Sequence, residues 1–463
     1  MEKLDQLILR SIADGNALKG HRDEVRLLLA KKPKSIVILD DDPTGTQTLQ
    51  QVPVLTSWAL PELEKELQHS PVFFILTNSR SLQAKEAQQL AKTLGQRLKM
   101  LSEKHKKEVV VISRSDSTLR GHYPIEVNAL AQGLGSPRAK HFFIPAFFEG
   151  GRYTCGDVHY VADNGSFVPA AKTPFAKDST FGYASSNLKD YLVEKHGASL
   201  TKEQVRSVSI GELRNDSPAE LAKKIGANDN SHVIVNATAL ADLEKFVVAT
   251  WELNVPVIYR TAASFLNAIT AQRPAPLLQK EDIGGPRNTN GILSVIGSYV
   301  PKTTSQLHYL KAHYNATFLE FDVQGLFDKT EWEADLQEKA KMVDNMLSQG
   351  TNVVVYTSRE VKTGSTKEES LKIVNRVSMA LTALIGRLVV QPRAILAKGG
   401  ITSSDIAVKS LAIGRATVLG QIAKGVPVWR ADQQSKFPGL PYVVFPGNVG
   451  NDALLHTVLK SME

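Results

Sequence analysis

Cysteine is nearly missing from this chain, and long apolar runs are missing altogether. Cys155 is the single cysteine among 463 residues, so no disulfide can form within the chain, and an unpaired thiol is typical of a reducing compartment. No stretch approaches the roughly 20 consecutive apolar residues that a membrane-spanning helix needs. Residues 1–15 intersperse charges among their apolar side chains, which favours a surface helix over a secretory signal. We therefore expect a cytoplasmic protein without a membrane span.

Several catalytic motifs are also missing. The chain contains no GxxxxGK[ST] phosphate loop, no HExxH zinc motif and no GxSxG nucleophile turn. His122, His159 and Cys155 have spacings that match no metal-binding motif, so we interpret them as substrate-side or structural residues. Enzymes built on those three motifs are thereby disfavoured.

The charge of the chain is moderately basic. Lysine and arginine outnumber aspartate and glutamate by 55 to 47, which gives a formal charge of +8. The basic residues are spread along the chain rather than gathered in long blocks, so nucleic acid is not an expected partner. A positive cleft raises the local concentration of phosphates and carboxylates. We therefore expect small anionic substrates.

Short β-branched runs alternate with longer amphipathic stretches, as in sheets of buried parallel strands connected by helices. In the first part of the chain we expect strands at residues 35–39, 72–76, 109–113, 141–145, 233–237 and 256–260, and helices at 62–68 and 84–104. In the second part we expect strands at residues 292–298, 317–322, 352–358, 394–400, 416–420 and 442–450. The pattern predicts two α/β domains with largely parallel sheets flanked by helices, and an active site in the cleft between them.

The length of the chain exceeds what one ordinary hydrophobic core can organise, and its composition marks where it divides. Residues 271–291 concentrate proline, glycine and polar side chains, as linkers do. We predict a first domain over residues 1–275, a linker over 276–290 and a second domain over 291–463. Residues 149–187 show no clear period, and we expect a long functional excursion there that could act as a lid.

The strongest local feature is a strand that runs directly into Asp40, Asp41 and Asp42. Ligands of open α/β sheets bind at the carboxyl ends of the strands. Adjacent carboxylates repel one another unless a metal, a basic group or a substrate hydroxyl balances them. A ligand site is one interpretation, and the alternative is that one aspartate caps the following turn while the others face solvent.

Two further strands end in polar residues. Arg80 follows the second strand, and Arg114, Ser115, Asp116 and Ser117 end the third. An arginine fork matches a carboxylate, and hydroxyl or aspartate side chains bind the hydroxyl groups of a polyol. Each arginine taken alone also fits a surface ion pair. Because all three strand ends should converge on one edge, the set favours a site for a sugar acid.

The second domain contains glycine turns at the ends of its strands. Glycines followed by a helix let backbone N–H groups approach a phosphate closely, although glycines also end strands in any α/β fold. We expect these turns to bind a nucleotide tail through residues at three strand ends, namely Ser298, Gly399, Gly400, Ile401, Thr402 and Gly447.

These motifs resemble those of the four-carbon acid sugar kinases, which phosphorylate acids such as threonate, erythronate and 3-oxo-tetronate. The resemblance extends over nearly the whole chain and rests on the ordered segments DDDPTGTQT, TNSRSL, SRSDSTLRGHYPIE, IPAFFEGGRYT, TPFAKDSTFGY, AKGGITSSD and FPGNVGND. The chain departs from the commoner pattern in three places: Asp-Pro replaces Asp-Leu before Thr-Gly, Arg114 replaces a lysine, and PGNVG replaces KSGNFG. The identity of the acid is therefore open.

The resemblance implies an N-terminal domain that binds the acid sugar and a C-terminal domain that binds ATP. It implies that Asp41 or Asp42, Arg80 and residues 114–117 hold the acid, while Ser298, residues 399–402 and Gly447 hold ATP. In the mechanism we expect, Arg80 and Arg114 anchor the carboxylate, Asp41 or Asp42 accepts the hydroxyl proton, and Asp116 orients the sugar. ATP would arrive with Mg²⁺.

Two other functions stay open. A regulatory protein could keep the same binding residues and sense a sugar acid without phosphorylating it. A Mg²⁺-dependent phosphatase or aldolase could use the same acidic strand end, although the glycine turns of the second domain argue against it. The metal ligands, the stereochemistry of the acid and the pairing of the chain with itself as a homodimer are also open.

Overall fold

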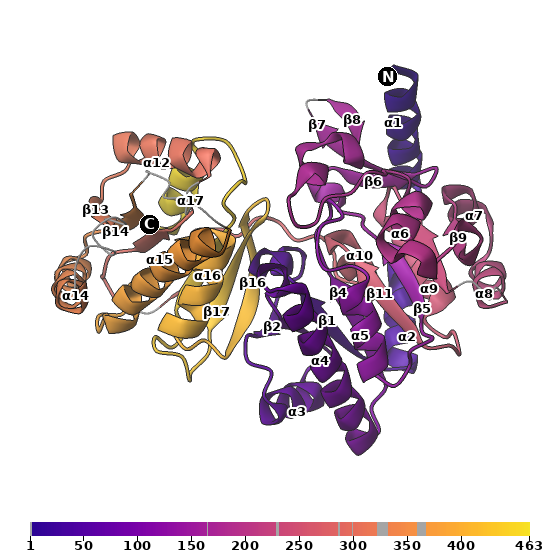
Figure 1. Ribbon diagram of the computed structural model, residues 1–463, viewed down its shortest axis with the longest axis horizontal. Helices are drawn as coiled ribbons and strands as arrows, with labels where there is room; N and C mark the ends of the chain where they lie inside the picture. Colours follow the sequence, from indigo (N-terminus) through magenta and orange to yellow (C-terminus); the bar gives the residue numbers. More distant parts are fainter. Residues whose placement is uncertain are drawn as a thin grey trace. The chain divides into compact units, whose positions relative to one another are not determined.

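The computed structural model describes residues 2–163, 165–227, 231–285, 288–298, 300–321, 332–358 and 367–463. The chain forms two compact units (Figure 1). The first contains Met1–Leu49 and Trp58–Pro274, and the second contains Gln50–Ser57 and Ala275–Glu463. The short segment belongs to the second unit because its strand β2 (Val52–Leu55) pairs antiparallel with β16 (Arg415–Ala423).

The sheet of the first unit is parallel throughout the pairs described. Its strands follow the order β3 (Val72–Leu76), β1 (Ser35–Asp40), β4 (Val109–Arg114), β11 (Val257–Thr261), β5 (Lys140–Ile144), β10 (His232–Val235) and β9 (Val205–Val208). Most positions of β1, β5 and β10 are buried, which explains their continuous apolar runs. The predicted α/β class with a largely parallel sheet is confirmed.

Helices flank this sheet in two groups. One group contains α3 (Leu60–His69), α4 (Ala84–His105) and α5 (Ile125–Gly133). The other contains α1 (Glu2–Ala17), α2 (Arg22–Lys31), α7 (Ile210–Asn215), α8 (Pro218–Gly226), α9 (Leu240–Thr250) and α10 (Ala263–Thr270). The backbones of α4 and α5 approach closely at Gly95 and Gly133, where a Cβ on Gly95 would lie 2.7 Å from a backbone carbonyl.

Residues 149–187, which we expect to form a long excursion without a clear period, contain regular strands. They contain a second, antiparallel sheet of β6 (Arg152–Cys155), β7 (Val158–Asp163) and β8 (Ser166–Pro169), and α6 (Leu188–His196) follows them. The strands are only four to six residues long and are interrupted by glycines, so no period extends far enough to be recognised.

The sheet of the second unit, in contrast, is mixed. Its parallel part follows the order β13 (Thr317–Phe321), β14 (Val353–Thr357), β12 (Leu293–Ile296), β15 (Ile395–Lys398) and β18 (Pro441–Phe445), and β17 (Val426–Ala431), β16 and β2 continue it antiparallel. The helices described here are α11 (Lys280–Ile283), α12 (Pro301–His313), α14 (Trp332–Ser348), α15 (Lys367–Arg387), α16 (Gly400–Asp405) and α17 (Leu454–Met462).

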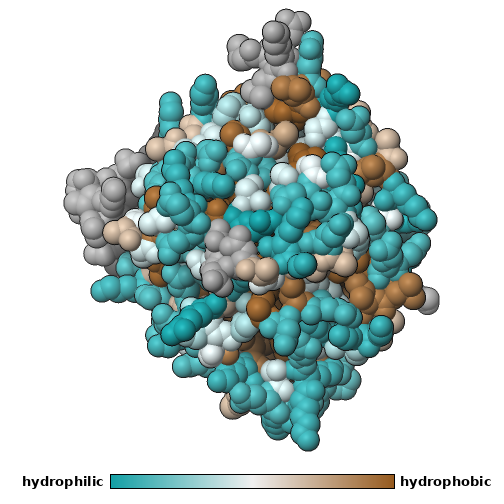
Figure 2. Space-filling model, turned by 90° about the vertical axis from the view of Figure 1, so that its right-hand side faces the viewer, coloured by the Kyte–Doolittle hydropathy of each residue, from teal (hydrophilic) through white to brown (hydrophobic). Residues whose placement is uncertain are grey.

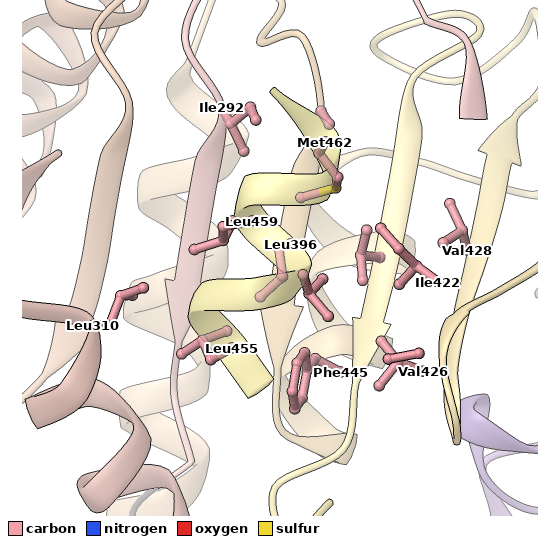
Figure 3. Packing of buried hydrophobic residues seen from close by; sticks show 14 of the residues in the cluster. Ile292, Leu310, Leu396, Ile422, Val426, Val428, Phe445, Leu455, Leu459 and Met462 are labelled. Carbon is pink, nitrogen blue, oxygen red and sulfur yellow. The ribbon is translucent and has the colours of Figure 1, made fainter. Parts of the chain in front are cut away.

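The core of the second unit lies between its sheet and helices α12 and α17. Figure 3 shows side chains of α17 packing beside Leu396 and Phe445 of the sheet. Leu278 and Ile283 also belong to this core, and Leu278 donates its backbone N–H to the carbonyl of Gln421. The segment that we expected as a linker is therefore partly packed onto the second unit.

The surface seen in Figure 2 is largely hydrophilic, with hydrophobic side chains in scattered small groups. Within the described ranges, no helix combines enough length with enough apolar character to cross a bilayer.

Candidate functional site

The ends of β1, β3 and β4 meet at one edge of the first sheet. In the parallel register, Asp40 lies opposite Leu76 on one side and opposite Arg114 on the other. The residues that follow each strand therefore emerge together. This places Asp41, Arg80 and Ser115 close to one another.

Asp40 forms the floor of this site. Its side chain is fully buried, and its Oδ1 accepts a hydrogen bond of 3.0 Å from Nη1 of Arg114. Burial raises the pKa of Asp40 to about 7, against the opposing charge of Arg114 and with the help of the two aspartates that follow. Gly45 lies so close that a Cβ there would overlap both partners of this ion pair. The absence of a side chain at position 45 is thus a condition for the pair.

Asp41 lies above this floor and is also buried. It accepts hydrogen bonds from Nε and Nη2 of Arg80, at 3.3 and 2.7 Å, and from the Oγ of Ser115 at 2.5 Å. Burial acts to raise the pKa of Asp41, but Arg80, followed by Arg260 and Arg114, holds it below its usual range. Asp41 is therefore an ionised and fully engaged carboxylate.

Asp42 is more accessible than its two neighbours, with 21% of its side chain exposed. Its Oδ1 accepts hydrogen bonds from the N–H and the hydroxyl of Thr44 and so caps the short 3₁₀ helix Pro43–Thr48. Its Oδ2 lies 3.6 Å from Nη1 of Arg80. Asp42 thus both caps the turn, as one interpretation of the sequence has it, and presents a carboxylate oxygen at the strand ends.

Asp116 and Arg120 form a second ion pair beside Arg80. Nε of Arg120 donates to Oδ2 of Asp116 at 2.7 Å, and the hydroxyl of Thr118 donates to the same oxygen. Burial opposes ionisation of Asp116, but Arg120 and Arg80 hold its pKa below the usual range. Nη1 of Arg120 also lies 3.6 Å from Asp178, so the excursion of residues 149–187 contributes a charge to this edge.

Ser117 contributes its backbone to the site. Its carbonyl accepts a hydrogen bond of 2.8 Å from Nε2 of the buried His159, whose Nδ1 then accepts from the hydroxyl of Thr154. Burial lowers the pKa of His159 to about 4, so the ring is neutral near neutral pH. His122 similarly bonds to the carbonyl of Leu82. Of the two open interpretations, both histidines fit the structural one.

Sequence reasoning missed several residues of this site. Arg120 lies in the segment SRSDSTLRGHYPIE, but its pairing with Asp116 depends on the fold of the loop and cannot be predicted from that segment. Arg260 lies within an apolar strand, and Glu126 opens a helix; they pair with each other at 3.2 Å. An arginine inside a buried strand needs a partner, which is the signal that could have found Arg260.

The predicted nucleotide residues lie at one edge of the second sheet, because β12, β15 and β18 are adjacent and parallel. A Cβ on Gly447 would lie 2.8 Å from the Oγ of Ser298, and one on Gly399 would lie 3.2 Å from the Oγ1 of Thr402. Gly399 also has a φ of +119°, which favours glycine. Gly400 begins α16, and the side chain of Ile401 is 46% exposed.

Lys398 ends β15 beside these turns, and the sequence pattern does not predict its contact with them. Its side chain is fully buried, and its Nζ donates to the carbonyls of Pro446 at 3.0 Å and Gly447 at 3.5 Å. Burial lowers the pKa of Lys398 to about 7. This lysine therefore ties the turn after β18 to the end of β15.

The pH dependence of unfolding tests whether burial lowers the pKa of Lys398. Because the pKa of Lys398 lies below its ordinary value of 10.5, the unfolded chain binds more protons than the folded protein between about pH 7 and pH 10, so Lys398 makes the folded state more stable as the pH rises. Urea denaturation across this range should show the wild type gaining stability relative to Lys398→Met. The exposed Lys409 provides the control, since Lys409→Met should follow the wild type. A constant difference between wild type and Lys398→Met would contradict the assignment.

Carboxylates in the described part of the chain do not gather into a metal site of their own, since no group of three or more His, Cys, Asp or Glu side chains there is arranged to hold an ion. Mg²⁺ at phosphoryl-transfer sites is usually held by one or two carboxylates together with phosphates and water. A Mg²⁺ that arrives with a nucleotide would therefore be held mainly by the phosphates and water.

Two family models match separate parts of the chain. A family model described as the sugar-binding N-terminal domain matches residues 36–269, just over half of the chain, and one described as the nucleotide-binding C-terminal domain matches residues 293–455. A D-erythronate kinase of Heliobacterium modesticaldum is 24% identical over 361 residues, which cover 76% of this chain and 75% of that protein.

Two crystal structures share the fold. A Salmonella typhimurium LT2 protein, described as a proposed tRNA synthase, has a TM-score of 0.68 at 16% identity and covers 93% of this chain and 98% of its own. A Haemophilus influenzae protein has a TM-score of 0.63 at 15% identity, with 92% and 100% covered. At these identities the two crystal structures support only the fold, whereas the two matched family models show the family. The chain belongs to the four-carbon acid sugar kinase family.

Proposed function

We propose that this protein transfers the γ-phosphoryl group of ATP to a hydroxyl group of a four-carbon sugar acid. One observation supports this most directly. The partly exposed arginines Arg80 and Arg120 lie beside partly exposed carboxylates at one sheet edge of the sugar-binding domain, in a chain that also contains a nucleotide-binding domain. A sugar acid offers the matching groups, because it has one carboxylate and several hydroxyls.

The guanidinium groups of Arg80 and Arg120 are the proposed anchors for the substrate carboxylate. Both side chains are partly exposed, at 19% and 23%, whereas Arg114 is buried against Asp40. Arg152 adds a third positive charge close enough to interact with both Asp116 and Arg120, although burial lowers its pKa. We therefore assign Arg114 to the support of this edge and the carboxylate contact to Arg80 and Arg120.

Asp42 is the proposed acceptor of the hydroxyl proton. Of the two candidates, Asp41 already accepts hydrogen bonds on both oxygens and is only 2% exposed, while the Asp42 side chain is 21% exposed and accepts its hydrogen bonds from Thr44 on Oδ1. The new bond joins the substrate oxygen to the γ-phosphorus, the bond to the β-phosphate oxygen breaks, and ADP leaves. Asp116 would orient the other hydroxyls, and Ser115 and Ser117 would support Asp41 and the loop.

The glycine turns of the second unit are the proposed seat of the ATP phosphates. Backbone N–H groups at Gly400 and Gly447 can approach a phosphate without a side chain of their own in the way. The N–H of Gly399 is donated to the carbonyl of Phe445 at 2.8 Å, so Gly399 contributes only through its missing side chain. The hydroxyls of Ser298 and Thr402 lie beside these turns. Ile401 offers an exposed apolar side chain for the remainder of the nucleotide. Mg²⁺ bound with ATP would neutralise phosphate charge.

The test is ADP formation from ATP and Mg²⁺ across a panel of four-carbon acids: D- and L-erythronate, D- and L-threonate, and the 3-oxo-tetronates. We expect one acid to stimulate ADP formation strongly above the rate with ATP alone, and mass spectrometry to show the acid gaining one phosphoryl group. D-erythronate is the first acid to try, because a related protein is a D-erythronate kinase. Calorimetric binding of an acid without any ADP formation would instead favour a sensor.

A further inference from the structure

Arg260 makes a dense set of buried contacts behind the candidate site. It lies on β11, opposite Ser113 of β4, and its side chain is 5% exposed. Nη1 donates to the Oγ of Ser113 at 2.8 Å and to Glu126 at 3.2 Å, while Nη2 donates to the Oγ of Ser115 at 2.7 Å. Arg260 is too buried to contact a substrate directly. Its contact with Ser115, however, connects it to the residues at the strand ends.

Ser115 connects Arg260 to Asp41. A hydroxyl has one proton to donate and two lone pairs that accept. Because Arg260 occupies a lone pair of Ser115, the proton can point either to Oδ2 of Asp41 at 2.5 Å or to the carbonyl of Arg120 at 3.1 Å. The shorter contact to an ionised carboxylate is the stronger of the two. Arg260 thereby orients the Ser115 hydroxyl toward Asp41.

The backbone at Gly121 covers this connection. Gly121 has a φ of +121°, and a Cβ there would lie 2.8 Å from Nη2 of Arg260, 2.8 Å from the Oγ of Ser115 and 3.2 Å from Oδ2 of Asp41. The main chain at Gly121 thus lies close to Arg260, Ser115 and Asp41 at the same time. The main chain closes over the connection, so water has little access and the hydrogen bonds operate in a low-dielectric environment.

We propose that Arg260 is a positioning residue of the acid-sugar site. Acting through Ser115, it holds Asp41 in the orientation in which Asp41 grips both Nε and Nη2 of Arg80, the proposed anchor of the substrate carboxylate. The inference rests on the proposed function, since it takes the connection Arg260–Ser115–Asp41 to serve the binding of the acid.

The charges around Asp41 give this role a pH signature. Arg80, Arg260 and Arg114 face Asp41, as do the carboxylates of Asp40 and Asp42. Burial acts to raise the pKa of Asp41, and the three arginines lower it. Without Arg260 the pKa of Asp41 rises, so the grip on Arg80 is lost at a higher pH than in the wild type.

The test compares Arg260→Met, Arg260→Lys and Ser115→Ala with the wild type. Arg260→Met leaves Glu126 without its charged partner, so Arg260→Met/Glu126→Gln is made as well, to keep a folded variant available. For kcat/KM toward the acid we expect about a ten- to hundredfold loss in the Met variants, the range for hydrogen bonds to charged groups, with KM for ATP unchanged. Arg260→Lys should recover part of the loss, because it keeps the charge but not the fork.

Two readouts separate positioning from mere structural support. The acid limb of kcat/KM against pH should move to higher pH in the Met variants and in Ser115→Ala. The losses of Arg260→Met/Glu126→Gln and Ser115→Ala should not add when combined, because both break one connection. Arg214→Met is the matched control, since Arg214 forms a similarly buried pair with Asp242 at 2.9 Å; it should lower stability without moving the acid limb.

Each outcome bears on one claim. An unmoved acid limb and additive losses in folded variants would overturn the role of Arg260 while leaving the kinase in place. If the wild type phosphorylates no acid on the panel, the proposed function fails, and Arg260 is then judged on urea denaturation between about pH 2 and pH 5, because the lowered pKa of Asp41 puts its contribution to stability in that range. There the stability contributed by ionised Asp41 should be lost at a higher pH in Arg260→Met/Glu126→Gln than in the wild type. Identical profiles would overturn the proposal.

Discussion

Asp42→Asn is expected to lower kcat by about a hundredfold to ten-thousandfold, the range that a positioned general base contributes. Asparagine keeps an oxygen that can accept from Thr44, so the cap of the 3₁₀ helix and the fold should persist. It loses the ability to take a proton. Steady-state kinetics with the best acid of the panel measures the effect, and calorimetry should find nucleotide affinity nearly unchanged.

Asp23→Asn provides the matched control for this variant. Asp23→Asn makes the same change of charge at a position on α2 where 91% of the side chain is exposed. It should leave kcat unchanged. Turnover of Asp42→Asn within about threefold of the wild type would show that another group accepts the proton. Asp41→Asn would then be the next variant to measure.

Gly45→Ala is expected to destabilise the first unit by about 1–3 kcal/mol and to lower activity sharply, as small-to-large changes in packed interiors do. The added methyl group has no free space, because Asp40 and Arg114 occupy it and both are buried. The ion pair must move, and with it the floor on which Asp41 rests. Chemical denaturation and kinetics on the same preparation measure both effects.

Gly211→Ala is the corresponding control. Gly211 lies in α7, and the nearest atom to a Cβ there would be the Oγ of Ser209 at 3.8 Å, an ordinary contact. Alanine also has the higher helix propensity, so stability should stay level or rise slightly. If Gly45→Ala behaves like Gly211→Ala, the ion pair beneath the site can shift at little cost, and our account of the floor is wrong.

The strands and helices with strong apolar patterns could be predicted from the sequence. Residues 72–76 coincide with β3, and residues 84–104 nearly coincide with α4, because each has an unbroken pattern of its own. β9 and β2 were missed for local reasons. β9 has two half-buried polar positions among its four residues, and β2 contains Pro53, which argues against a strand.

The residues at the strand ends could also be predicted, since an acidic or basic residue directly after a buried strand is visible in the sequence. Which of them touch is a matter of strand order. Asp40 and Arg114 pair because β4 lies beside β1, and Arg260 reaches Ser115 because β11 lies beside β4. Such neighbours come from distant parts of the chain, and local patterns contain no information about them.

The strand β2 has a consequence for how the second unit can be made. It lies before residue 58 in the chain, yet it pairs with β16 of the second unit, whose other described strands all follow residue 275. During synthesis this segment must wait for its partner until nearly the whole chain has been made. A fragment cut at residue 275 would leave β16 with an unpaired edge, which invites association with other chains. The nucleotide-binding half is therefore not a self-contained module that gene fusion could move intact; it depends on eight residues borrowed from the other end of the polypeptide.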